Sequence, residues 1–280
     1  MSRAKLTVLT ENSTHQAGLM AEHGWSVWIE WGEENFLFDT GQTGLWRENA
    51  KRLNLSWSRL SGVILSHGHY DHTGGLPALG ELPPQTRIFL HPDALSGKYS
   101  VPRNSPARFI GMSQGSRAWL ERQGDRIQFV TAPLELAPGL WLSGPIPRSH
   151  SFEDVGGPFF LDADGASPDP LWDDMALGLV TRDGLVVLLG CAHAGVVNTM
   201  DHLRSVLGNP PIHTVCGGMH LLQASPERMA ATLSAFEDYK IQRLGVAHCT
   251  SFAAAVALSQ RFPGKCFVPH VGTVMEFCLS

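Results

Sequence analysis

Short apolar runs alternate along the chain with segments in which apolar residues recur at helical spacing. The apolar runs, bounded by turn-forming residues, predict strands over residues 6–10, 25–31, 35–41, 61–66, 87–91, 125–130, 139–146, 175–181, 185–190, 212–218 and 241–248 and a closing segment over 265–277. The helical spacing predicts helices over 45–55, 116–124, 194–208, 225–240 and 251–262, and one more that begins at 73. Strands followed by mixed strands and helices occur twice, which predicts an α/β fold of two sheets packed face to face with helices outside.

Two connections between the predicted elements are unusually long. They span 93–118 and 147–174 and are rich in Ser, Pro and Gly. Long connections in a compact domain usually cover or line functional sites. The segment 32–35 is expected to form a hairpin turn. No linker or short internal repeat divides the chain, so we expect a single domain over 1–280.

A dense group of polar residues directly follows one predicted buried strand. The run SHGHYDHTGG places His67, His69, Asp71 and His72 within six residues. Burying four such groups requires partners for each of them, and a bound cation is a common partner. Imidazole and carboxylate together suit zinc, iron or manganese. A polar loop with chance histidines is the alternative, and the tight spacing weighs against it.

Other histidines stand at the same kind of position. His193, His220 and His248 each follow an apolar run and a few small residues, as His67 does. Any one of them alone would be better interpreted as a structural histidine, but strand ends that meet at one sheet edge favour a shared site. Asp39 also ends an apolar run, where it can orient a liganding imidazole or cap the turn that follows.

These motifs together resemble the metallo-β-lactamase superfamily over nearly the whole chain. The resemblance rests on FLFDTG, SHGHYDHTGGL, LLGCAHAGVVN and GVAHCT. It implies a four-layer αβ/βα sandwich with a metal site at one edge of the two sheets. A finer resemblance connects the chain to the subgroup named for dihydropterin-ribofuranosylaminobenzene 5′-phosphate synthase, through AEHGWSVWIEWG, GPIPR followed by FED, GGMHLL and AHCTS.

The resemblance implies two metal sites in this chain. The first would be formed by His67, His69 and His193, and the second by Asp71, His72 and His248. Many superfamily members have a bridging Asp where this chain has Cys191. A thiolate there can ligate zinc, and a buried thiol can equally pack as a small apolar group. We therefore expect one or two divalent ions per chain, zinc first, with iron, manganese and magnesium as alternatives.

Two further residues are candidates for contact with a substrate. His220 lies in CGGMHLL, where paired glycines permit close backbone approach, and is predicted to contact the substrate or donate a proton. Arg148 can pair with a phosphate or carboxylate through its bidentate guanidinium, although an exposed loop arginine is nearly as good an interpretation. Trp25, Trp28 and Trp31 cannot all share one face of a strand, and core packing is favoured over a pocket role for them.

Composition limits the classes of partner. The net charge is −5 without a basic stretch, which argues against nucleic acid but not against a small anionic substrate. The N-terminus lacks a long apolar run, and no segment is apolar enough to span a membrane. The five cysteines are few and odd in number, as in a cytoplasmic protein with reduced thiols. The oligomeric state is left open by the sequence.

The favoured function is a hydrolase that uses metal-activated water on an ester, phosphoester, lactone or amide bond of a small molecule. Asp71 and His220 would be its catalytic residues, with His220 and Arg148 binding the substrate. The subgroup resemblance implies an alternative, a synthase that condenses a dihydropterin pyrophosphate with an aromatic amine. A metal-containing ligand-binding or regulatory protein is the non-catalytic alternative.

Overall fold

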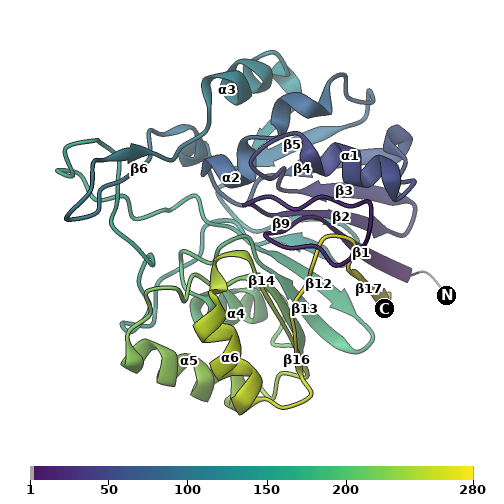
Figure 1. Ribbon diagram of the computed structural model, residues 1–280. Helices are drawn as coiled ribbons and strands as arrows, with labels where there is room; N and C mark the ends of the chain where they lie inside the picture. Colours follow the sequence, from purple (N-terminus) through teal and green to yellow (C-terminus); the bar gives the residue numbers. More distant parts are fainter. Residues whose placement is uncertain (1–2, 280) are drawn as a thin grey trace.

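The computed structural model describes residues 3–279 as two large mixed sheets that face each other (Figure 1). The first sheet has the strand order β17-β1-β2-β3-β4-β5-β8, formed by Val274–Cys278, Arg3–Thr10, Ser26–Trp31, Glu34–Phe38, Leu60–Ile64, Arg87–Leu90 and Ile127–Phe129. The second has the order β16-β15-β14-β13-β12-β10-β9, formed by Cys266–Phe267, Arg243–Ala247, Ile212–Gly218, Gly184–Leu188, Leu177–Thr181, Leu140–Leu142 and Leu134–Ala137.

Helices cover the outer face of each sheet. The described residues contain six α-helices, α1 to α6, which span Leu45–Arg52, Tyr70–Thr73, Gln114–Glu121, Val196–Val206, Pro226–Asp238 and Phe252–Arg261. Apolar residues of α1 and α3 pack in one core cluster with the first sheet, and those of α4, α5 and α6 pack in another with the second. A third cluster joins the facing sides of the two sheets. The predicted four-layer α/β sandwich is therefore confirmed, and it follows from strands that are apolar on both faces.

The tryptophans of the first hairpin follow the strand alternation. Trp25 and Trp31 belong to the cluster between the sheets, whereas Trp28 belongs to the cluster beneath α1. All three are buried. Core packing rather than a pocket role is confirmed for them. The hairpin turn is shorter than predicted, because Trp31 already pairs with Glu34 and only two residues remain in the turn.

The helix predicted to begin at Thr73 does not form. The segment instead contains the one-turn α2 and a 3-10 helix over Leu76–Leu79. Gly74 and Gly75 separate them, and a Cβ on either would lie 2.0 Å from a carbonyl oxygen of Gln42 or Thr40. This close approach breaks the helix, since the backbone here packs against another loop rather than against a helical surface.

The two long connections meet in a third, three-stranded sheet. Its order is β11-β6-β7, formed by Phe159–Phe160, Tyr99–Ser100 and Arg108–Phe109. Figure 1 shows β6 projecting to the left of the sandwich. The region 93–118 also contains α3, which begins before the predicted helix because Ser113 accepts a hydrogen bond from the Ser116 backbone. Within residues 3–279, no helix is long and apolar enough to cross a membrane.

Candidate metal centre and pocket

The strand ends of both large sheets carry polar residues to one site. Asp39 directly follows β3, and His248 directly follows β15. His67 and His193 come a few residues after β4 and β13. The strands β3, β4 and β5 are parallel to one another, as are β13, β14 and β15, so their carboxyl ends emerge at common edges.

The first group of candidate ligands consists of three buried imidazoles. One ring nitrogen each from His67, His69 and His193 lies within 4.8 Å of the others. His67 Nε2 and His69 Nδ1 are 3.0 Å apart. His69 Nε2 and His193 Nε2 are buried and have no hydrogen-bond partner. A cluster of three buried imidazoles, with ring nitrogens left without partners, fits a bound cation.

The second group lies directly beside the first. His72 Nε2 is 3.2 Å from His248 Nε2, and His248 Nε2 is 3.4 Å from Asp71 Oδ2. Cys191 Sγ is 3.1 Å from His72 Nε2. The same sulfur falls in one ligand group with His67 and His72 and in another with His248 and Cys249. Cys191 therefore lies between the two groups.

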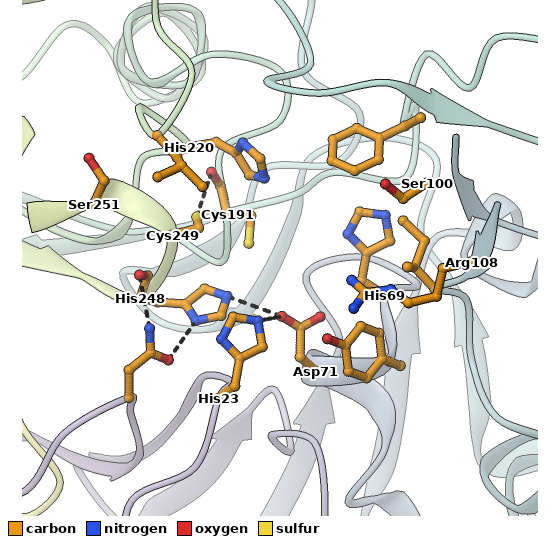
Figure 2. A pocket seen from close by; sticks show the side chains of 15 residues that line it. His23, His69, Asp71, Ser100, Arg108, Cys191, His220, His248, Cys249 and Ser251 are labelled. Carbon is orange, nitrogen blue, oxygen red and sulfur yellow. Dashed lines mark hydrogen bonds and ion pairs between the residues drawn. The ribbon is translucent and has the colours of Figure 1, made fainter. Parts of the chain in front are cut away.

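His23 joins the second group, although little in the sequence singles it out. His23 Nε2 is 3.0 Å from Asp71 Oδ2, and the two form a further ligand group with His248. Figure 2 shows His23 and His248 pointing toward Asp71, with His69 and Arg108 on the other side of this carboxylate. His23 lies just before β2, so it had no strand end in front of it as a sequence marker.

A buried hydrogen-bond network orients the imidazoles. Asp39 Oδ2 is 2.7 Å from His72 Nδ1, as predicted for a carboxylate behind a ligand. The Ser66 backbone N–H and hydroxyl donate to the two Asp39 oxygens at 2.7 Å, and Ser66 Oγ is also 2.9 Å from His67 Nδ1. Glu11 accepts a hydrogen bond from the His248 backbone at 3.0 Å. The contacts of Asp39 and Ser66 fix the orientation of the His72 and His67 rings, and Glu11 holds the backbone at His248.

Burial and charge set the protonation states at the site. Burial lowers the pKa of His67, His69 and His193 well below the ordinary value, which leaves these imidazoles neutral and able to act as ligands. Burial would raise the pKa of Asp71, but its bonds with His23 and His248 outweigh burial and lower the pKa. Asp71 is therefore a carboxylate at neutral pH.

A pocket of about 350 Å³ opens onto this cluster (Figure 2). It is lined by Asn12, His23, His69, Tyr70, Asp71, Ser100, Arg108, Ile110, Phe159, Cys191, His220, Leu222, His248, Cys249 and Ser251. The pocket therefore joins candidate ligands to apolar residues and to one arginine. Its volume is that of a site for a small molecule.

His220, predicted to contact the substrate or donate a proton, is one of the residues that line the pocket. Its ring centroid is 4.4 Å from that of His193, and its Nδ1 is buried without a partner. Its backbone is left-handed, with φ of 44°. Burial lowers the pKa of His220 to about 4, so the ring is a neutral imidazole at pH 7. It can offer a hydrogen bond to a substrate, but it is not the charged proton donor that a histidinium would be.

Arg148, predicted to bind the substrate, is not among the residues that line the pocket. Its guanidinium donates to the backbone carbonyl of His193 at 2.8 Å, and to those of Pro170 and Leu171. The group also stacks over Trp172. These bonds engage both terminal nitrogens of the guanidinium, while its Nε is buried without a partner among the described residues, so Arg148 holds the backbone at His193.

Comparisons with known proteins agree with this geometry. The profile of the Metallo-beta-lactamase superfamily matches residues 20–190. A 7,8-dihydropterin-6-methyl-4-(beta-D-ribofuranosyl)-aminobenzene-5'-phosphate synthase of Methanocaldococcus jannaschii is 28% identical over 97% of this chain and 95% of its own. The crystal structure of Tm1679, a metal-dependent hydrolase of the beta-lactamase superfamily, superposes with a TM-score of 0.82 and 29% identity, covering 97% of this chain and 98% of that one.

Proposed function

The chain belongs to the metallo-beta-lactamase superfamily, and from this premise we propose that it is a metal-dependent hydrolase of small molecules. The bond attacked would be an ester, phosphoester, lactone or amide. The observation that carries the proposal is the pair of adjoining ligand groups, with the buried nitrogens of His69 and His193 left without partners. The similarity to a metal-dependent hydrolase over 97% of the chain supports it.

We assign His67, His69 and His193 to a first ion and Asp71, His72 and His248 to a second. Zinc is the first choice, because three neutral imidazoles with an open position are typical of catalytic zinc. A divalent ion held there would act as a Lewis acid and would lower the pKa of water toward about 7. Because Cys191 lies between the groups, where many superfamily members have a bridging Asp, we expect one or two ions per chain.

The chain's own side chains would perform the remaining steps. The Asp71 carboxylate, ionised at neutral pH, accepts a hydrogen bond from the attacking water and orients it. Neutral His220 offers an N–H to the oxygen on which negative charge develops. Phe159 and Leu222 line the pocket and limit the access of bulk water to the bond under attack.

Metal content and turnover of purified protein test the proposal. Protein isolated without chelator should contain one or two ions per chain. The variants His193→Ala and Asp71→Ala should contain less metal and should no longer hydrolyse phosphoester and lactone substrates. His15→Ala, which removes an exposed imidazole outside the pocket, is the matched control and should behave as the wild type. Full turnover by chelated protein or by Asp71→Ala would refute the hydrolase.

A synthase is the second candidate, because the methanogen relative is similar over almost the entire chain. In that case a dihydropterin pyrophosphate and an aromatic amine would meet in the pocket, and water would be excluded. Product analysis separates the two functions. A condensed pterin product supports transfer, whereas a simple hydrolysis product supports the hydrolase. A metal-loaded protein that retains ligand without turning it over would be a binding protein.

A further inference from the structure

We propose that the three-stranded sheet β11-β6-β7 is the substrate-recognition wall of the pocket, and that Arg108 on it binds an anionic group of the substrate. The inference rests on the proposed function in taking this pocket as the substrate site. It names the substrate class as a small apolar body that carries a phosphate or a similar anion. Arg108 takes the role that Arg148 does not fill.

The register of the small sheet aligns three pocket residues. Phe159 pairs with Ser100, and Ser100 pairs with Arg108, so the three lie in one row across the strands. Side chains of paired residues project from the same face of a sheet. All three line the pocket. The row therefore presents an aromatic ring, a hydroxyl and a guanidinium, in that order, to one cavity.

Arg108 is the sole lysine or arginine among the residues that line the pocket. Within residues 3–279 it forms no ion pair, and its guanidinium carbon lies 5.6 Å from the centre of the Tyr70 ring. Lys98, on the same connection, is in contrast neutralised by two buried carboxylates. Arg108 has a side-chain hydrogen bond with Tyr70. No carboxylate of the described residues neutralises it, so its charge and its remaining donors are available to a planar or tetrahedral anion.

The other end of the row provides an apolar surface beside the imidazoles. The Phe159 ring centroid is 5.3 Å from those of His69 and His193 and 5.6 Å from that of His220. Ile110 and Leu222 extend this surface. A flat apolar group can pack on Phe159 while an attached anion reaches Arg108. Phenyl phosphate has both parts and is a suitable probe.

Hydrogen bonds fix the small sheet to the segment that carries the candidate metal ligands. The Tyr70 backbone N–H donates to the Ile110 carbonyl at 2.9 Å, which ties the end of β7 to α2. Asp173 accepts from Lys98 at 2.8 Å and from the Gly68 backbone at 2.7 Å. The position of Arg108 relative to the candidate ligands is therefore set by the fold.

Calorimetric titration of the metal-loaded protein with phenyl phosphate tests the inference without requiring turnover. Arg108→Gln should weaken binding about 10- to 100-fold, the effect of losing charge-assisted hydrogen bonds. Arg108→Lys keeps the positive charge but loses the bidentate pair of donors, so its affinity should lie between those of the wild type and Arg108→Gln. Arg103→Gln is the matched control, because Arg103 is an exposed arginine on the same β6–β7 connection and does not line the pocket. Metal content is measured for every variant.

Equal affinity of Arg108→Gln and Arg103→Gln, or no binding by the wild type, would overturn the inference. A second titration uses inorganic phosphate, which lacks the apolar part. Arg108→Gln should lose affinity for it by the same factor, and every variant should bind it more weakly than phenyl phosphate. Binding of phenyl phosphate that depends on Arg108, without hydrolysis of any substrate, would support anion recognition by Arg108 and contradict the proposed hydrolase function. Hydrolysis of neutral lactones, with phenyl phosphate binding that does not depend on Arg108, would support the hydrolase function and contradict anion recognition by Arg108.

Discussion

At the residue scale, one carboxylate behind the candidate ligands connects several groups. Asp39 contacts His72, the Ser66 hydroxyl and the Ser66 backbone, and it is fully buried. It adopts φ of 58°, a left-handed conformation uncommon outside glycine, just where the strand ends. Strain of this kind persists where surrounding contacts define the backbone.

Asp39→Asn should therefore lower metal affinity about 10- to 100-fold, the usual effect of losing a partner behind a ligand. The amide keeps the size of the side chain but loses the charge that orients His72. Competition with a coloured chelator measures the affinity. The control is Asp201→Asn, which alters a half-exposed carboxylate bonded to His150 outside the pocket. Unchanged affinity in Asp39→Asn would contradict the ligand role of His72.

At the scale of elements, the small sheet depends on a buried ion group. Lys98 is buried and contacts Asp169 at 3.0 Å and Asp173 at 2.8 Å. Lys98→Met would leave two buried carboxylates without their cation, which should lower the free energy of unfolding by about 3–5 kcal/mol. Urea denaturation measures the change. Lys5→Met removes a half-exposed pair with Glu30 and should cost about 1 kcal/mol or less.

The stability difference between the wild type and Lys98→Met should depend on pH in a definite direction. Burial lowers the pKa of Lys98, but Asp173 and Asp169 outweigh burial and raise the pKa above its ordinary 10.5. The stabilisation is thus fully present below pH 10.5 and is lost as the pH rises through the higher, folded-state pKa. The gap between wild type and Lys98→Met should stay constant from neutral to mildly alkaline pH. A gap that closes near neutrality would contradict the ion group.

Strand ends and the metal motif could be predicted from the sequence, whereas the small sheet could not. Apolar runs ending in His67, His193 or His248 are local patterns that report burial and position directly. The strands of the small sheet are two residues long and come from connections far apart in sequence, so they have no periodicity to detect. Arg108 was missed for that reason, and the backbone contacts of Arg148 could not be predicted because its carbonyl partners are distant in the chain.

At the scale of the whole molecule, the candidate centre joins the two sheets. His67 and His69 come from the half built around the first sheet, and His193 and His248 from the half built around the second. An ion bound by both halves stabilises the folded state by mass action, by about 4 kcal/mol when free metal exceeds the dissociation constant a thousandfold.

Removal of metal should therefore lower the melting temperature measured by calorimetry. Acid should act in the same direction, because protons compete for the imidazoles. His193→Ala, which should already lack the first ion, is the control and should lose less on chelation than the wild type. Identical melting of chelated and metal-loaded wild type would show that no ion bridges the halves.

The small sheet also bears on how such a protein changes over evolutionary time. Its strands belong to connections between core elements, while the candidate ligands other than His23 lie at the ends of core strands or, for Asp71 and His72, in the short helix α2 that follows β4. Replacements at pocket-facing positions of the connections, such as Ser100, Arg108 and Phe159, would alter which molecules are selected and leave the candidate ligands themselves unchanged. Selectivity and reactivity are thus inherited through separate stretches of the chain, and close relatives with identical ligands can diverge in what they accept.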